Sequence, residues 1–390
     1  MTCEVESTVN SQILEAILHD KSDGIRKALE MLLNEAFKVD RQGYLNAKPY
    51  ERSDARVDYA NGFKPKTLKS RVGELELLIP QVRGGDYYPA CLERGSRSER
   101  ALLLACAEMY VQGVSTRKVK EVMEELCGIA INSSDVSRAT AKLDVTLKAW
   151  RERPIGVIKY LYIDARYEKV RQSGIVVDCA VLIAQGVTDE GRRVILGVSV
   201  SLSEAEPHWR KFFESLVARG MHGVELIISD AHSGLKAARQ AVFPSVPWQR
   251  CQFHLQQNAQ SHVPKQSLKK PVAGKIRAIF DAENRMEADR LLSLAVSHYE
   301  KEAPDLSNWM EANIPESLTV FSFPNDYHKR LRTSNSLERI NREIRRRTRV
   351  ASIFPNTASC ERLVTAILVE ISDEWEVENK FIDFQQLKIQ

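Results

Sequence analysis

Three consecutive β-rich segments constrain the fold of this chain more than any other feature. The stretches VIKYLYID, GIVVDCAVLIAQGVT and RRVILGVSVSLSE follow one another between residues 157 and 204, with turn residues between them. A helical segment, HWRKFFESLVARG, comes next, followed by a short apolar strand, VELIISD, and a second helix from about Ser233. This order predicts a mixed α/β layer whose strand–helix–strand part is a right-handed crossover.

Two of the predicted strands end in an aspartate. Asp164 ends the first strand and Asp230 ends the fourth. The first and fourth strands are neighbours in such a sheet, so both carboxylates should lie at the carboxyl ends of adjacent strands, where open α/β sheets bind their ligands. The alternative for each aspartate alone is a cap on the following helix.

The remaining chain is mainly helical and divides around this α/β layer. The predicted segments are a helical N-terminal segment and linker (1–60), a small β-hairpin module (61–97), a helical domain (98–153), the first part of the α/β domain (154–254), an all-α insertion (255–330) and the C-terminal part of the α/β domain (331–390).

The helical domain contains a helix-turn-helix pattern between about residues 113 and 145. Ser115 can cap a first helix, Gly128 ends it, and Ser133 can cap a second helix. The groove-facing candidates are Ser134, Ser137 and Arg138 on the second helix, and Arg117 and Lys118 on the first are candidate backbone contacts. A plain helical pair within a bundle is the alternative.

The most cationic part of the chain runs from Lys329 to Arg349, where nine basic residues stand against two glutamates. In NSLERINREIRRRTRV (335–350), Glu338 shares one helix face with Arg342, Arg345 and Arg349, while an apolar face can dock on the sheet. Arg339, Arg346 and Arg347 lie on other faces and are not assigned a role, with solvated charge as the simplest alternative. A basic cluster of this kind is either a solvated surface or a phosphate-binding site.

The three carboxylates of Asp164, Asp230 and Glu338 can together hold two divalent ions. Mg²⁺ suits such an all-oxygen site because it keeps waters and takes further ligands from substrate phosphate, and Mn²⁺ is a substitute. The arginines beside Glu338 would then bind phosphates flanking the reacting one.

Four motifs carry a resemblance to the mutator-type bacterial insertion-sequence transposases. They are YLYIDARYEKVR, LIISDAHSGLKAA, WQRCQFH and RTSNSLERINREIRRRTRV…FPN, and they occur in the family's order. The resemblance spans at least residues 60–376. It implies a ribonuclease H-like DDE catalytic domain, interrupted by an all-α insertion and preceded by mainly helical DNA-binding modules, with Asp164, Asp230 and Glu338 as the catalytic and metal-binding triad.

The expected function is therefore DNA transposition. The N-terminal modules would bind the terminal inverted repeats of the element. Water would attack the phosphodiester at the element end, and the freed 3′-hydroxyl would attack a second phosphodiester. The resemblance implies a copy-out, paste-in route through a circular intermediate, and a homodimer would hold two ends. The alternatives are a ribonuclease H-like nuclease or resolvase, and a non-catalytic DNA-binding protein derived from a transposase.

A Cys-x-x-His pair, Cys251 and His254, invites a zinc interpretation, with His232 as a third ligand. Four-ligand zinc sites need a second pair, and none stands at suitable spacing. The resemblance makes these residues site-proximal, and a histidine with a purely structural hydrogen bond is the alternative. Trp309 in the insertion fits an apolar stripe of core packing.

Seven scattered cysteines without CxxC pairing fit reduced thiols in a cytoplasmic protein. No secretory signal and no apolar run long enough for a membrane span stand in the sequence. The expected location is therefore the bacterial cytoplasm, with nucleoid association when the protein is bound to DNA.

Overall fold

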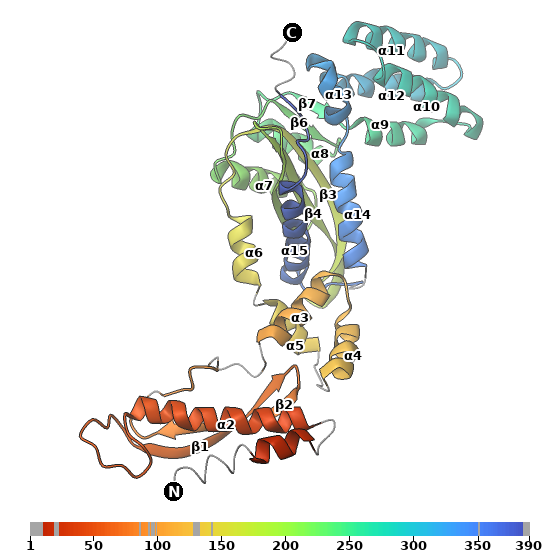
Figure 1. Cartoon of the computed structure of the whole chain (residues 1–390). Coiled ribbons are helices and arrows are strands. Elements are labelled where there is room, and N and C mark those ends of the chain that lie inside the picture. Colours follow the sequence, from red (N-terminus) through yellow and green to blue (C-terminus); the bar gives the residue numbers. More distant parts are fainter. Residues whose placement is uncertain are drawn as a thin grey trace. The chain divides into compact units, whose positions relative to one another are not determined.

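The computed structural model describes residues 11–18, 23–85, 87–92, 94, 98, 100–127, 133–141, 143–349 and 352–384. The chain divides into two compact units after Lys142, earlier than the sequence-based boundary at 153 (Figure 1). Within the described ranges, no helix is both long and apolar enough to cross a membrane.

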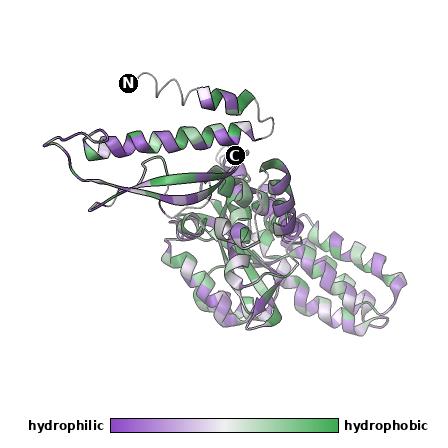
Figure 2. Ribbon diagram, turned by 90° about the horizontal axis from the view of Figure 1, so that it is seen from below, coloured by the Kyte–Doolittle hydropathy of each residue, from purple (hydrophilic) through white to green (hydrophobic). Residues whose placement is uncertain are grey.

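After a helical segment at residues 11–18, the first unit continues with a helix packed on a β-hairpin. Strands β1 (Ala60–Ser70) and β2 (Gly73–Val82) pair antiparallel, which confirms the predicted hairpin. Alternate residues of β2 are buried against Phe37 of helix α2 (Gly24–Leu45), namely Leu75, Leu77 and Ile79. Helix α2 carries hydrophobic and hydrophilic residues along its whole length, as a helix buried on one side should (Figure 2).

Three further helices complete the first unit. They are α3 (Arg100–Val111), α4 (Thr116–Cys127) and α5 (Ser133–Ala141), and they share a small core that includes Val119 and Val136. The Ser115 hydroxyl accepts a hydrogen bond from the Lys118 amide at 3.1 Å, as expected of an N-cap. The turn with Gly128 lies outside the described residues.

The second unit is built on a five-stranded mixed sheet with the order β5-β4-β3-β6-β7. Its strands are β3 (Ile158–Gln172), β4 (Ile175–Thr188), β5 (Arg193–Ser201), β6 (Leu226–Ser229) and β7 (Trp248–Arg250). The first three strands pair antiparallel, whereas β3, β6 and β7 are parallel. The predicted adjacency of the first and fourth strands is confirmed.

Helices cover both faces of this sheet (Figure 1). Trp209 and Phe213 of α7 (Glu206–Ala218) pack with Leu161 and Ile163 on one face, together with α8 (Ser233–Val242). Helices α14 (Asn335–Thr348) and α15 (Thr357–Glu376) pack against strands of the sheet. Helix α6 (Asp144–Arg151) joins α15 through an Arg362–Asp144 ion pair of 2.6 Å.

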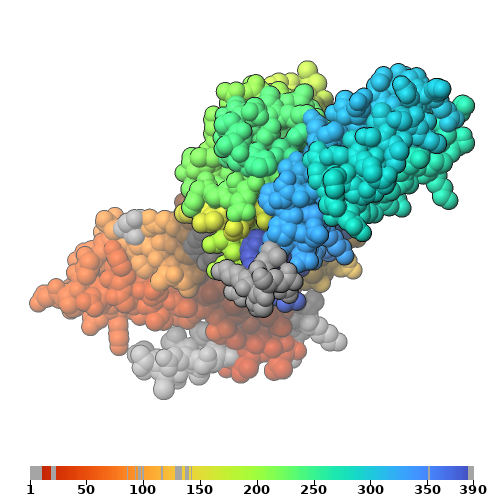
Figure 3. Space-filling model, turned by 90° about the horizontal axis from the view of Figure 1, so that it is seen from above, coloured from red at the N-terminus to blue at the C-terminus, as the bar shows by residue number. Residues whose placement is uncertain are grey.

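Between β7 and α14 the chain forms a helical group with its own core (Figure 3). Its elements are α9 (Gln252–Ala259), η1 (Gln260–His262), α10 (Gln266–Phe280), α11 (Arg285–Tyr299), α12 (Pro304–Asn313), η2 (Ile314–Ser317), η3 (Thr319–Ser322) and α13 (Asn325–Leu331). Trp309 packs against this core, and its ring stacks on His262 at a centroid distance of 5.0 Å.

Candidate active site

Asp164 lies inside β3, so the prediction that it ends the first strand is wrong. Strand β3 continues to Gln172 because β4 pairs with it along its whole length. Its parallel pairing with β6 stops earlier, at Tyr162 opposite Ile228. Carrying that register on by two residues brings Asp164 opposite Asp230, which directly follows β6. The carboxyl edge of the sheet is therefore set by the short β6 rather than by the end of β3.

Helix α14 brings Glu338 to this edge. The predicted apolar face is buried, with Leu337 and Ile344 fully covered. The Asn341 side-chain amide donates to Asp164 Oδ2 at 2.8 Å, and Arg166 of β3 donates to the Asn341 carbonyl. These two bonds hold one flank of α14 against β3, beside Asp164.

The electrostatics of Asp164 connect it to the other predicted ligands. Its Oδ1 accepts a hydrogen bond from the Ala165 amide at 3.0 Å. Burial raises the pKa of Asp164 to about 6, and the Asp230 and Glu338 carboxylates act in the same direction, whereas His254 and the Ala165 N–H oppose them. Three carboxylates and one imidazole therefore share a single electrostatic environment.

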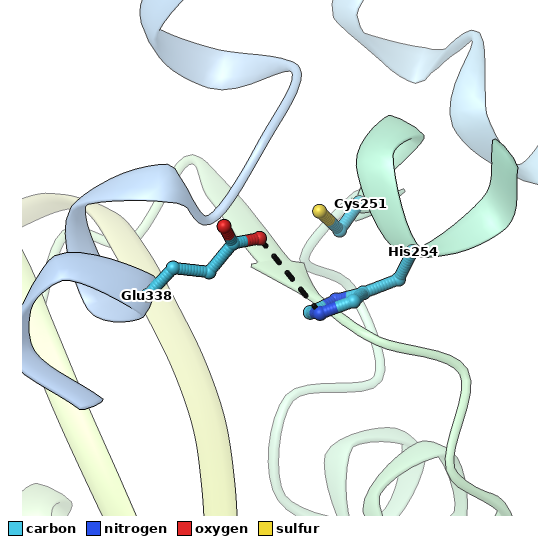
Figure 4. A group of neighbouring side chains, drawn as sticks. All are labelled: Cys251, His254 and Glu338. Atoms are coloured by element: carbon cyan, nitrogen blue, oxygen red, sulfur yellow. Dashed lines mark ion pairs between the residues drawn. The ribbon is translucent and has the colours of Figure 1, made fainter. Parts of the chain in front are cut away.

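His254 faces Glu338 across the site (Figure 4). The His254 Nε2 atom lies 3.8 Å from Glu338 Oε1. The Cys251 sulfur raises the pKa of His254 to about 9; burial works against this, and Asp164 and Asp230 add to it. His254 is thus a protonated cation beside the carboxylates at neutral pH.

Cys251 is fully buried at the N-cap of α9. Ser334, which precedes α14, donates to its sulfur through the backbone amide at 3.4 Å and through the hydroxyl at 3.3 Å. Burial raises the pKa of the Cys251 thiol, but His254 and Ser334 outweigh this and leave it below its ordinary value. Cys251 therefore couples the start of α9 to the start of α14.

The donor set at the sheet edge fits a hard divalent cation. Burial, with smaller contributions from the Asp230 and Glu338 carboxylates, raises the pKa of Asp164, and a bound cation would stabilise the charged carboxylates. The buried Glu338 Oε1 and Asn341 Oδ1 atoms have no hydrogen-bond partner among the described residues. Oxygen ligands of this kind suit Mg²⁺.

A zinc site at Cys251 and His254 fits less well. Their ligand atoms and that of Glu338 lie within 4.8 Å of one another, and the described residues offer no fourth ligand in this group. Zinc would also have to displace the proton that the raised pKa of His254 favours. His232 is not part of this group, since its Nδ1 lies 3.8 Å from Glu204 Oε2.

The arginines of α14 have two different roles. Arg342, Arg345 and Arg349 are exposed, and none of them forms an ion pair within the described part of the chain. Arg347 is buried and bonds to Glu343 at 2.7 Å and to Glu370 of α15. Solvated charge, the simplest alternative for Arg347, is therefore excluded, because Arg347 is buried between α14 and α15.

The predicted DNA-contacting residues of the first unit are only partly described. Arg117 is 90% exposed and pairs with Glu121 at 3.6 Å, and Lys118 pairs with the same glutamate at 3.2 Å. Ser134 is exposed on α5. The side chains of Ser137 and Arg138 lie outside the described part of the structure.

Sequence reasoning missed Asn341 and Ser334. Asn341 follows Glu338 by three residues, so helical spacing alone places the two side chains on neighbouring positions. Ser334 resembles an N-cap, and only the fold shows that its hydroxyl bonds Cys251 instead of the helix.

Comparison with known proteins gives a consistent result along the chain. The family described as "Transposase, Mutator family" matches residues 2–378. The transposase for insertion sequence element IS406 of Burkholderia multivorans is 57% identical, covering 98% of this chain and 100% of that protein. The transposase for ISRM5 of Rhizobium meliloti is 42% identical (99% and 97% covered). The transposase for IS256 in transposon Tn4001 of Staphylococcus aureus is 36% identical (98% and 100% covered).

Among solved structures, a chain in the cryoEM structure of the simian T-cell lymphotropic virus intasome with PP2A regulatory subunit B56 gamma covers 53% of this chain and 64% of its own length at 11% identity. Its TM-score is 0.17. The match along residues 2–378 and the close relatives show that this chain belongs to the Mutator family of transposases.

Proposed function

We propose that this protein is a DNA transposase that cuts and joins DNA at the ends of its own insertion sequence, with Asp164, Asp230 and Glu338 as its catalytic residues. One observation carries the proposal. The β3–β6 register, extended two residues beyond the Tyr162–Ile228 pair, brings Asp164 opposite Asp230, and Glu338 of α14 acts electrostatically on Asp164. A cluster of carboxylates of this kind serves metal-assisted phosphoryl transfer, whereas a purely structural role gives no reason to bring three carboxylates together.

The chemistry is that of metal-assisted phosphodiester attack. Two Mg²⁺ ions held by the three carboxylates would activate the attacking oxygen and stabilise the leaving oxygen. Asn341 orients the Asp164 carboxylate through its 2.8 Å hydrogen bond. Arg342, Arg345 and Arg349 neutralise backbone phosphates along the exposed face of α14. His254, at 3.8 Å from Glu338, balances carboxylate charge.

The architecture supports the remaining parts of the proposal. The sheet order, with three antiparallel strands and two parallel additions, agrees with a ribonuclease H-like domain. We assign α3 to α5 to recognition of the inverted repeats as a helix-turn-helix module, the helices between α9 and α13 to an insertion domain, and the active form to a homodimer in the bacterial cytoplasm. The copy-out, paste-in route belongs to the same proposal.

A strand-transfer assay tests the function. Purified protein is incubated with Mg²⁺ and labelled DNA that carries the inverted repeats flanking its own gene. End-specific nicking followed by joining is the expected result. Cutting without end preference would instead support a ribonuclease H-like nuclease or resolvase, and binding without cutting would support a non-catalytic DNA-binding protein.

Glu338→Gln provides the matched test of the site. It should abolish nicking and joining while DNA binding persists, because the helix and its arginines stay in place. Glu214→Gln, the same change at an exposed position of α7, is the control and should keep full activity. Joining by Glu338→Gln at the wild-type rate would refute the assignment of the triad.

A further inference from the structure

A cationic pocket opens on the flank of α14 away from Asp164. Its volume is about 280 Å³. Five basic side chains and one aromatic ring line it, contributed by β5, α13, the residues that link α13 to α14, α14 and the C-terminal segment. They are Arg193, Lys329, Arg330, Arg332, Arg339 and Phe381. We refer to it as the α14-flank pocket.

The positive charge of the α14-flank pocket exceeds what the described residues neutralise. Glu378 pairs with Arg193, and Asp281 pairs with Arg332 at 2.6 Å. Across the described part of the chain, Lys329, Arg330 and Arg339 form no ion pair. Burial lowers the pKa of Arg193; the Glu378 carboxylate opposes this, and repulsion from Arg339 and Arg330 adds to the lowering. The fold therefore holds these positively charged side chains together, from segments far apart in the chain, against their mutual repulsion.

The pocket is preorganised by contacts within the fold and is not a chance cluster of flexible side chains. The Phe381 ring lies between two guanidinium groups, at 5.1 Å from Arg193 and 4.8 Å from Arg330. The Phe381 amide donates to the Gly191 carbonyl at 2.8 Å. The Tyr162 hydroxyl, from the central strand, donates to the Arg330 carbonyl at 3.0 Å. Backbone and ring contacts thus position two of the cations before any ligand binds.

The pocket adjoins the catalytic residues without sharing them. Arg339 follows Glu338 directly, and consecutive helical residues point about 100° apart. Asn341, which bonds Asp164, points to the other flank of the same turn. A polyanion that crosses α14 at Glu338 therefore meets carboxylates on one flank and uncompensated cations on the other.

We propose that the α14-flank pocket binds a backbone phosphate of a DNA strand that passes over α14. Guanidinium groups bind phosphate oxygens in a bidentate fork, and Arg330 and Arg339 are the free members here. The pocket is smaller than the roughly 300–1,000 Å³ typical of drug-sized ligands, which suits a phosphodiester group. The proposal rests on the proposed function in naming DNA as the polymer. The phosphate belongs either to the element end or to the target DNA.

The test measures salt-dependent DNA binding of the full chain without divalent metal. In the double variant Arg330→Gln/Arg339→Gln, the slope of log affinity against log salt should decrease by about 1 to 2, since each lost phosphate contact removes about 0.9. Affinity near 0.1 M salt should fall about tenfold. The single variant Arg339→Lys keeps the charge and should keep the slope, which a purely structural role of Arg339 would not predict.

Two arms separate the sources of the phosphate. One measures metal-free binding to a labelled duplex with the element ends. The other measures, with Mg²⁺ present, how strand transfer depends on the concentration of a supercoiled target plasmid. A deficit in the first arm assigns the pocket to element ends, and a deficit confined to the second assigns it to target. Arg210→Gln removes the same charge from exposed α7 and is the control.

A wild-type slope and affinity in the first arm, together with a wild-type dependence of strand transfer on target concentration in the second, would overturn the proposal. Circular dichroism unfolding checks that the variants fold, which is expected because Arg330 and Arg339 are exposed. If the wild-type chain binds DNA but never cuts it, the proposed function fails while the binding test of the pocket remains informative.

Discussion

At the scale of single residues, Asp164 owes its orientation to Asn341. The Asn341 side-chain amide donates a hydrogen bond of 2.8 Å to Asp164 Oδ2, and the Ala165 backbone N–H donates to Oδ1. We predict that Asn341→Ala lowers the rate of end nicking about tenfold or more, because a hydrogen bond to a charged group is worth about 1.5–3 kcal/mol. It should also raise the Mg²⁺ concentration needed for half-maximal nicking.

A Mg²⁺ titration of nicking checks the role of Asn341. Asn341→Ser, which keeps a small donor at the same position, is the companion variant and should retain more activity than alanine. An unchanged rate together with an unchanged Mg²⁺ requirement would mean that the amide is not a positioning residue.

The second prediction at this scale concerns zinc. Cys251 and His254 invite a zinc site, yet a fourth ligand is absent from the described residues of the group, and zinc would have to displace the proton that the raised pKa of His254 favours. We predict that purified protein contains far less than one zinc per chain by atomic emission. A zinc-selective chelator should leave Mg²⁺-dependent nicking intact; stoichiometric zinc whose removal stops nicking would contradict this.

At the scale of elements, α14 is held to α15 by one buried arginine. Arg347 is 6% exposed and bonds both Glu343 and Glu370. We predict that Arg347→Met lowers the free energy of unfolding by about 2 kcal/mol, because it removes a buried guanidinium together with its ion pairs to Glu343 and Glu370. The neighbouring Arg346→Gln, at a side chain 61% exposed, should change it by about 0.5 kcal/mol or less. Urea unfolding measures both; equal effects would contradict the difference in burial.

The same contact makes stability depend on acid. Hydrogen bonding from Arg346, opposed by burial and aided by Arg347, lowers the pKa of Glu343 to about 2. Because the folded pKa lies below the unfolded value of 4.5, the contribution is complete above that pH and is lost as pH falls toward 2. As pH falls from 4.5 toward 2, the free energy of unfolding of Glu343→Gln should therefore decrease by about 1 kcal/mol less than that of wild type. Urea unfolding at several pH values measures this difference.

At the scale of the whole molecule, the two units have separate cores. The chain divides after Lys142, and the sheet core and the insertion core both lie beyond that point. We predict that residues 143–390 fold cooperatively when expressed alone and bind DNA in a salt-dependent manner. They should lose preference for the inverted repeats, which we assign to the first unit. A competition assay with repeat and random DNA measures this, and retained preference would move end recognition into the second unit.

The alternation and the helical periods of the sequence were enough to predict much of this molecule. They identified the hairpin, the three-strand run, the crossover to β6 and the amphipathic face of α14, because each pattern reflects burial within a few neighbouring residues. The resemblance along the chain likewise led to the family that the comparisons show.

Only the tertiary structure decided which charges meet. It shows that β3 continues past Asp164, that Asn341 bonds this aspartate, and that Arg347 lies under α15. It also brings Arg193 and Arg339 into one pocket from segments far apart in the chain. A helical or strand period records only whether a residue is buried. Strand register and ion pairing depend on partners far away in sequence, so no local pattern can contain them.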